Sequence, residues 1–148
     1  MEEKRKAKDK WFMKILLVSG LIVLISSLEA FMMAKDRTLF EIFLENNEAV
    51  GSFSDYLNLV LLNYIFSIAI PLIITIYTYL TLDKYGLNFS TRSFLFYRIF
   101  FGGMILIQIV NMVLRFSLTS IFYYLNIVLY LILLILVVRK PKKDEGER

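Results

Sequence analysis

Four long apolar runs fill most of this chain of 148 residues and decide the solvent in which it can fold. The runs lie near residues 12–33, 56–82, 94–116 and 118–138. Each one supplies the roughly 20 apolar residues that an α-helix needs to cross the hydrocarbon core of a bilayer. The sequence therefore predicts an all-α integral membrane protein, folded as a four-helix transmembrane bundle.

The segments outside these runs are short. Hydrophobic residues make up 58% of the sequence, above the roughly 45–50% of ordinary soluble domains. A soluble fold would expose too much of this apolar surface to water. We therefore expect one membrane domain over residues 1–148, with basic tails at 1–11 and 139–148 and no soluble catalytic domain.

The basic residues are divided unevenly between the two sides of the membrane that this helix order implies. Of the 17 lysines and arginines, 14 fall on the side of the two termini and three on the other side. Cytoplasmic loops of membrane proteins carry an excess of Lys and Arg. We therefore expect a multi-pass protein of the inner (cytoplasmic) cell membrane with both termini in the cytoplasm. A secretory signal is the weaker interpretation of the first run, because the small-residue cleavage site after Leu28 is poor.

Residues near the ends of the runs add detail to this topology. Four aromatic residues suit the aromatic belts at the two membrane–water interfaces: Trp11, Phe12, Tyr123 and Tyr124. Glu29 and Arg115 fall toward the outer ends of their helices, where we expect their side chains to reach water. No ionisable residue then remains at mid-depth, which disfavours a proton-coupled transporter.

The segment between the first two runs carries a helical pattern of its own. Thr38 and Glu41 have the spacing of a capping box. From residue 38 to about 48, Leu and Phe gather on one face and Glu on the other. We expect a short outer amphipathic helix that lies across the bundle, because Asp36 and Arg37 interrupt the first apolar run. Its apolar face should be covered by the bundle, by a partner or by lipid headgroups.

Polar side chains inside the apolar runs are the candidate functional residues. Gln108, Asn111 and Arg115 recur at i, i+3 and i+7 and so share one face of a helix. This face should contact protein or water, because unsatisfied polar atoms are costly in lipid. The other candidates for intramembrane contacts or for a pathway are Asn63, Ser67 and Asn126. We favour adhesion between helices over a lined pore, because amides do not titrate.

The very short connection near residue 117 predicts that the third and fourth runs form an antiparallel hairpin. Gln108 and Asn126 lie nine residues away from this turn on either side. We therefore expect these two amides to meet or to share a polar pocket.

Two further features concern helix packing. Pro71 lies inside the second run, where it leaves the carbonyl near Ser67 without its helical partner and favours a kink. Small residues allow helices to approach closely. The small residues that we expect at contacts between copies of the chain are Gly20, Ser27, Gly102 and Gly103.

The residue types that most catalysis needs are missing. The chain has no cysteine and no histidine, which excludes disulfides, thiolate chemistry, the usual haem ligation and most zinc or copper sites. The serines of the runs thus lack a histidine base. We expect a non-enzymatic protein with no cofactor. A carboxylate-only magnesium or calcium site stays open, although the acidic residues lack EF-hand spacing.

The basic tails indicate which partners the chain would bind. Anionic lipid headgroups of the bilayer are the favoured partner, and a cytoplasmic protein is a further candidate. Nucleic acid is not expected, because the tails lack interleaved aromatic residues. The residues that we expect at these contacts are Lys4, Arg5, Lys6, Arg139, Lys140, Lys142 and Lys143.

Three classes of function are compatible with these features. We favour a self-associating membrane subunit, a homo-oligomer that anchors or signals to a cytoplasmic partner complex, for example in a prokaryotic defence or stress system. The alternatives are a small oligomeric ion channel or transporter, and an immunity protein that binds another membrane protein. The gross plan is similar to that of small membrane subunits of prokaryotic antiviral systems, although no residue motif carries this similarity. The abundance of Ile, Phe, Lys and Asn suggests an AT-rich bacterial source.

Overall fold

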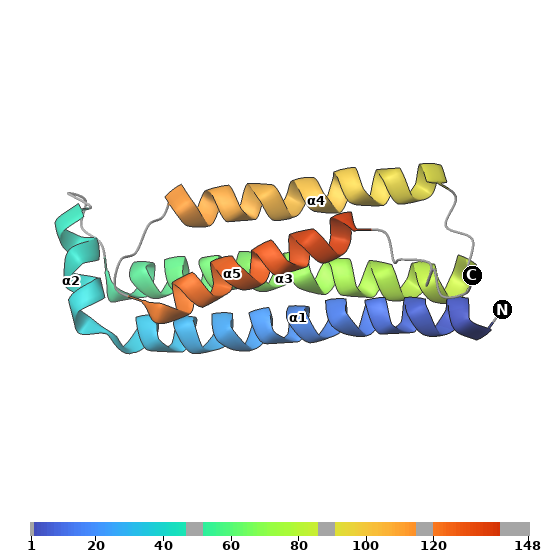
Figure 1. Cartoon of the computed structure of the whole chain (residues 1–148). Coiled ribbons are helices and arrows are strands. Elements are labelled where there is room, and N and C mark those ends of the chain that lie inside the picture. Colours follow the sequence, from blue (N-terminus) through green and yellow to red (C-terminus); the bar gives the residue numbers. More distant parts are fainter. Residues whose placement is uncertain (1, 47–51, 86–90, 115–119, 140–148) are drawn as a thin grey trace.

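The computed structural model of the chain describes residues 2–46, 52–85, 91–114 and 120–139. These ranges form α1 (Glu2–Lys35), α2 (Arg37–Asn46), α3 (Phe53–Tyr85), α4 (Thr91–Leu114) and α5 (Ile121–Val138), as Figure 1 shows. No strand occurs within them. Four stretches of the described helices are long and apolar enough to cross a bilayer: Asp9–Lys35, Phe53–Thr81, Ser93–Leu114 and Ile121–Val138. The predicted all-α bundle of four membrane-length helices is confirmed, and the chain is a multi-pass membrane protein.

Three helices begin earlier than their apolar runs: α1 at Glu2, α3 at Phe53 and α4 at Thr91. α1 reaches back to Glu2, because the Lys, Arg, Glu and Ala residues of the basic segment are good helix formers. α3 starts at Phe53 because the two residues Ser52 and Asp55 cap it reciprocally. The Asp55 carboxylate accepts a hydrogen bond from the Ser52 amide at 2.8 Å, and the Ser52 hydroxyl accepts one from the Asp55 amide at 3.2 Å. The predicted start of the fourth span at 118 lies outside the described residues, and α5 itself begins at Ile121.

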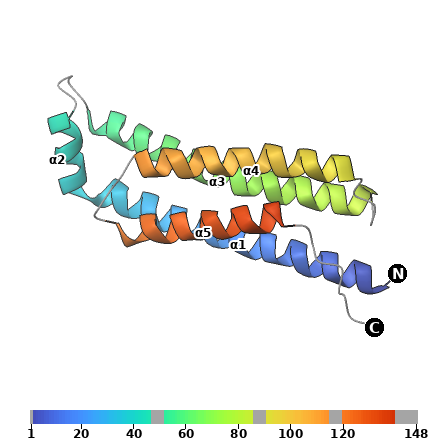
Figure 2. The same ribbon diagram turned by 45° about the horizontal axis from the view of Figure 1, so that its top comes forward.

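The long helices run up and down, each antiparallel to the next (Figures 1 and 2). α1 packs along α3 and α5, α4 packs mainly on α5, and α3 touches α4 more sparsely. α1 begins and α5 ends toward the same end of the bundle, which we call the termini end. The opposite end carries α2, and we call it the α2 end.

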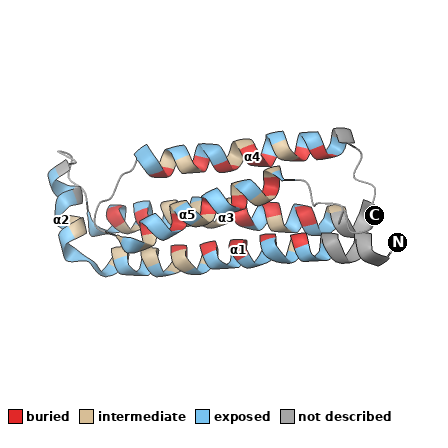
Figure 3. Cartoon of the chain, viewed as in Figure 1, coloured by how far each residue is buried: buried red, intermediate tan, exposed pale blue. Residues whose placement is uncertain are grey.

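Each spanning helix buries one stripe and exposes the rest of its circumference (Figure 3). Only 17% to 33% of each membrane-length window is buried, although the exposed remainder is rich in Leu, Ile and Phe. Such a surface fits a lipid solvent, in which apolar side chains need no protein cover. The largest apolar side chains with no exposed surface are Ile15, Ile22, Ile74, Tyr97, Ile105, Tyr130 and Leu133.

An aspartate rather than the predicted threonine caps α2. The Asp36 carboxylate accepts hydrogen bonds from the Thr38 hydroxyl at 2.5 Å and from the Thr38 amide at 2.9 Å. The Thr38 side-chain bond above all holds the pKa of the Asp36 carboxyl below its usual value. The predicted capping box of Thr38 and Glu41 is wrong, because Thr38 lies in the first turn of a helix that already begins at Arg37.

The short amphipathic helix itself is present, over Arg37–Asn46, and residues 47 and 48 of the predicted range 38–48 lie outside the described residues. It turns away from the axis of α1 and lies across the α2 end (Figure 1). The Phe40 ring packs on Phe53 and Tyr56 of α3, with centroid distances of 5.1 and 5.6 Å. Leu44, one turn further on, is still 38% exposed. Protein therefore covers only part of the apolar face of α2.

Candidate intramembrane polar site

A carboxyl group and an amide meet between α1 and α5. The Nδ2 group of Asn126 donates a hydrogen bond to Oε2 of Glu29 at 2.9 Å. The Ser26 hydroxyl donates a longer bond to Oδ1 of Asn126, at 3.5 Å. Ser26 and Glu29 are three residues apart on α1, so both side chains lie on the face that packs against α5. We call these three residues the Glu29–Asn126 site.

The acidic group of this site lies well inside a membrane-length helix. Glu29 is six residues before the end of the span Asp9–Lys35, about 9 Å along the helix axis. Of the acidic side chains that the structure describes, Glu29 alone is not exposed. The Glu29 side chain keeps intermediate exposure, and α5 offers its carboxyl group a hydrogen-bond donor.

The chemistry open to this site is binding and adhesion. A carboxyl group beside an amide can hold a proton or supply one ligand to a cation. The described residues contain no group of three or more side chains that could hold a metal ion. The Ser26 hydroxyl donates to Oδ1 of Asn126 and not to a basic nitrogen, since the chain has no histidine.

A second polar contact joins α5 to α3 at the proline. Pro71 has no amide hydrogen, so the carbonyl of Ser67 lacks its helical donor. The hydroxyl of Tyr130, a fully buried residue of α5, donates a hydrogen bond to this carbonyl. Ser67 therefore contributes its backbone, not its hydroxyl, to the contact between helices. The position of Pro71 in the sequence predicted that the Ser67 carbonyl lacks its helical donor. No sequence pattern predicted that the Tyr130 hydroxyl would be the donor instead.

Replacing Tyr130 with Phe should lower the free energy of unfolding by about 1–2 kcal/mol, because the Ser67 carbonyl then lacks a donor in an apolar interior. In a Pro71→Ala background the new amide at position 71 can bond this carbonyl, so the same replacement should cost less than half as much. Unfolding by SDS in mixed micelles measures the four free energies of this double-mutant cycle. Equal costs in the two backgrounds would show that the hydroxyl does not serve the carbonyl.

The two amides predicted to meet do not form a hydrogen-bonded pair. Both Gln108 and Asn126 are buried, with 6% and 1% of their surface exposed. Asn126 bonds Glu29 and Ser26 of α1, and no hydrogen bond joins it to Gln108 in the described part of the chain. The physical reason is that α1 offers Asn126 a carboxylate, which is a stronger acceptor than an amide.

The remaining predicted polar residues have less protein cover. Asn63 on α3 and Asn111 on α4 are half-buried, as is Ser67. Neither asparagine side chain makes a hydrogen bond within the ranges that the structure describes. Arg115, which was predicted to share a helix face with Gln108 and Asn111, lies outside those ranges.

An aromatic cluster joins the spanning helices at the termini end. Tyr97 of α4 is fully buried, and its hydroxyl lies 2.7 Å from the Thr78 hydroxyl of α3. Its ring stacks on Tyr77 at 6.1 Å and meets Trp11 of α1 edge-on at 6.2 Å. Trp11 in turn donates its indole hydrogen to the Leu136 carbonyl of α5 at 2.9 Å. The predicted place of Trp11 in an interface belt is therefore wrong, since Trp11 is buried.

The predicted place of Tyr123 in the interface belt at the α2 end is wrong for the same reason. Tyr123 is buried and donates its hydroxyl to the Met112 carbonyl of α4 at 2.6 Å. Its neighbour Tyr124 is exposed, as expected of a belt residue. Sequence reasoning missed these two contacts because a polar aromatic group can find its partner either in interfacial water or on a backbone carbonyl.

Two of the small residues expected at contacts between copies are used within the chain. Gly102 lies beside Val138 and Leu134 of α5, within 4 Å of where a Cβ would stand. The Ser27 hydroxyl lies 3.1 Å from the Tyr64 hydroxyl of α3. Around Gly20 and Gly103 the space is open, so both remain candidates for a contact with another chain.

Comparisons with known protein families, curated proteins and solved structures gave no match to this chain. Its function is therefore inferred from its own residues and geometry.

Charge is divided between the two ends of the bundle. Among the described side chains, the termini end carries one acid, Asp9, and four cations: Lys10, Lys14, Arg98 and Arg139. The α2 end carries two cations beside a larger set of acids: Lys35, Arg37, Glu29, Asp36, Glu41, Glu45 and Asp55. Of the tail residues expected at headgroups, Arg139 is exposed. The side chains of the others lie outside the described part of the chain: Lys4, Arg5, Lys6, Lys140, Lys142 and Lys143.

Proposed function

We propose that this protein is a non-enzymatic, self-associating membrane subunit that anchors or signals to a cytoplasmic partner complex. One observation carries the proposal: Asn63 and Asn111 are amides inside membrane-length helices with no hydrogen bond in the described chain. An amide left unpaired in hydrocarbon costs several kcal/mol. A helix of another chain can supply the missing partners.

The two amides lie on one seam of the bundle. Asn63 is 14 residues before Tyr77 on α3, and Asn111 is 14 residues after Tyr97 on α4. Tyr77 and Tyr97 stack on each other, and 14 residues correspond to about 21 Å and nearly four full turns on each helix. Helices of ideal geometry would thus place the two asparagines at a similar depth, on the α3 and α4 edges that face each other.

The hydrogen-bonded and stacked contacts described across this seam lie at the termini end. Every hydrogen bond and ring contact between α3 and α4 that the structure describes involves Tyr77, Thr78, Tyr97 or Phe101. Toward the α2 end, no such contact is seen among the described residues of the two helices. The seam there is a suitable place for a helix of a second chain.

Amide chemistry favours a second copy of this chain as the partner. An asparagine side chain is both donor and acceptor, so two copies related by a two-fold axis can satisfy each other's amides. Hydrogen bonds of this kind between membrane helices contribute about 0.6–2 kcal/mol each.

The basic tails support the proposed contact with a cytoplasmic partner. Residues 1–11 and 139–148 together contain ten Lys and Arg residues, and α1 begins and α5 ends toward one end of the bundle. By the positive-inside rule, this end would face the cytoplasm. A cluster of this charge suits anionic headgroups of the inner leaflet or an acidic surface of a soluble protein.

A small ion channel or transporter is the second candidate, and Glu29 favours it. Ionisable groups inside spanning helices often mark ion pathways. The interior of a single bundle is filled by side chains with no exposed surface, among them Ile22, Ile74 and Leu133. A pathway would therefore form between copies rather than through one bundle.

Cysteine cross-linking tests the contact between copies directly, because the chain has no native cysteine. Met104 lies two turns before Asn111 on the same face of α4, whereas Val110 is 56% exposed on another face. We expect oxidation in native membranes to give covalent dimers of Met104→Cys and far fewer of Val110→Cys. Replacing Asn63 and Asn111 with Leu should weaken the dimer by about 3–30-fold. Equal cross-linking at both positions would refute a dimer through this seam.

Native mass spectrometry in mild detergent separates the three classes of function. A homo-oligomer with a soluble partner that is lost on deletion of Lys142–Arg148 supports the proposal. A homo-oligomer that makes liposomes leak ions supports the channel. A single copy bound to a different membrane protein supports the immunity class and contradicts self-association.

A further inference from the structure

A hollow of about 550 Å³ lies at the α2 end, between α2 and the start of α3. Its walls include Ala34 of α1, Arg37, Phe40 and Leu44 of α2, and Phe53 of α3. The volume falls within the roughly 300–1,000 Å³ of typical small-molecule sites. The hollow is separate from the Glu29–Asn126 site and shares no residue with it.

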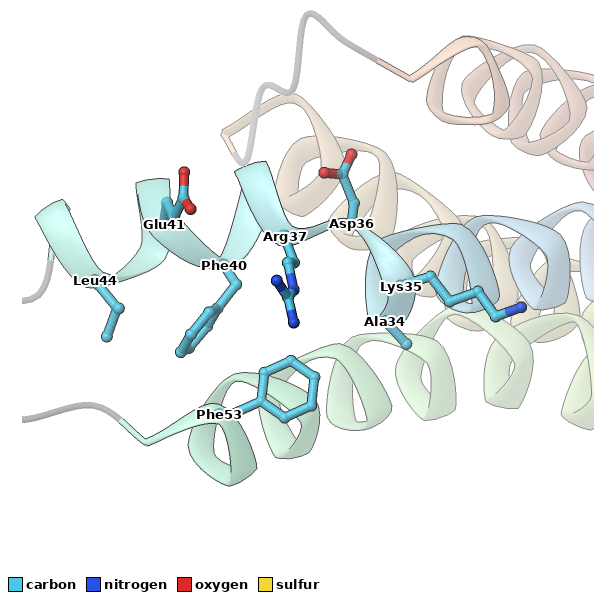
Figure 4. Close-up of a pocket in the computed structure, with 8 residues that line it drawn as sticks. All are labelled: Ala34, Lys35, Asp36, Arg37, Phe40, Glu41, Leu44 and Phe53. Atoms are coloured by element: carbon cyan, nitrogen blue, oxygen red, sulfur yellow. The ribbon is translucent and has the colours of Figure 1, made fainter.

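The side chains around the hollow are sorted by polarity (Figure 4). The Arg37 guanidinium points into the space between α2 and α3, together with Phe40, Leu44 and Phe53. The carboxylates of Asp36 and Glu41 lie on the other side of α2. Between α2 and α3 the hollow thus presents Arg37 against an apolar wall, and Lys35, Asp36 and Glu41 complete its lining.

Arg37 is available for a ligand. It makes no ion pair with any side chain that the structure describes, and it is exposed. The nearest carboxylate in sequence, that of Asp36, already accepts hydrogen bonds from Thr38 and Leu39. A guanidinium in an apolar hollow favours an anion with two oxygens in a plane, because it can donate two parallel hydrogen bonds.

The position of the hollow along the spanning helices indicates which kind of anion it binds. Its walls come from the last residues of the span Asp9–Lys35 and the first of the span Phe53–Thr81. The ends of helices that span a bilayer lie where lipid headgroups meet acyl chains. The apolar face of α2 is also only partly covered by protein, with Leu44 38% exposed. A ligand with an apolar body would complete that cover.

We propose that the hollow binds one phospholipid with a net negative headgroup from the leaflet at the α2 end. Arg37 binds the phosphate, and the upper part of an acyl chain packs on Phe40, Leu44 and Phe53. This site lies at the opposite end from the basic tails and does not depend on self-association. It assigns a lipid partner to α2, which crosses the end of the bundle.

Native mass spectrometry of the full chain, released from nanodiscs of phosphatidylcholine and phosphatidylglycerol, tests the site. We expect retained phosphatidylglycerol with the native chain and a loss of about tenfold or more with Arg37→Gln. Lys35→Gln is the matched control, because it removes the adjacent cation, whose ammonium group lies over the Phe31 ring at 4.3 Å from its centre. Leu44→Ser should also weaken retention without changing any charge.

The controls separate the possible outcomes. Circular dichroism should show that Arg37→Gln stays folded, since Arg37 is exposed. Inorganic phosphate added at millimolar concentration should not displace the lipid, because it lacks the acyl contacts. Displacement by phosphate would show a simple anion site and overturn the proposal. Full retention by Arg37→Gln, or equal loss with Lys35→Gln, would overturn it as well.

Discussion

Replacing Tyr97 with Ala is expected to lower the free energy of unfolding in mixed micelles by about 2–3 kcal/mol. Tyr97 has no exposed surface and contacts rings of α1, α3 and α4, so its loss leaves a cavity where these helices join. Aromatic-to-Ala changes in water-soluble cores cost about 3–5 kcal/mol. The expected value here is lower, because a spanning helix gains little by transfer out of lipid and loses mainly packing.

The matched variant Tyr97→Phe keeps the ring and removes only the hydroxyl. The Thr78 hydroxyl still donates a hydrogen bond to the Ile74 carbonyl at 2.6 Å, so both the Thr78 hydroxyl and the Ile74 carbonyl keep a partner. We expect a cost below about 1 kcal/mol for this change. A similar cost for both variants would mean that packing at Tyr97 contributes little to the stability of the bundle.

Replacing Asn126 with Leu is expected to lower the free energy of unfolding by about 2 kcal/mol or more. The carboxyl group of Glu29 then loses its hydrogen-bond donor, 2.9 Å away in the native chain, within a membrane-length helix. Removing one partner of a buried charged group costs about 1–3 kcal/mol or more. SDS-induced unfolding in mixed micelles measures this loss.

The double variant Glu29→Leu, Asn126→Leu distinguishes a specific pair from a general loss of polarity. Removing both partners leaves no unsatisfied group, so the double variant should be nearer to the native stability than Asn126→Leu alone. As a control, Asn58→Leu changes an exposed asparagine of α3 and should have little effect. Additive losses in the double variant would contradict a direct coupling of Glu29 and Asn126.

The sequence alone determined which segments cross the membrane, because a backbone in hydrocarbon must satisfy its own hydrogen bonds. A run of about 20 apolar residues in a bilayer therefore forms an α-helix, whatever packs around it. The short helix at Arg37–Asn46 was also predictable from its alternation of Phe and Leu with Glu. Its start was missed by one residue, because both Asp36 and Thr38 are good capping residues and local sequence does not choose between them.

Only the tertiary structure decided which polar groups meet. Their equal distance from the hairpin turn predicted Gln108 and Asn126 as partners. The rotation of α5 instead directs Asn126 to Glu29 of α1. In the same way, Trp11 and Tyr123 lie inside the bundle on the carbonyls of Leu136 and Met112. Helical periodicity gives the face that a residue occupies, whereas the neighbour on that face depends on how each helix is rotated and paired. In lipid, no single apolar stripe dictates that rotation, because nearly all sides of these helices are apolar, and side-chain packing with a few hydrogen bonds selects it instead.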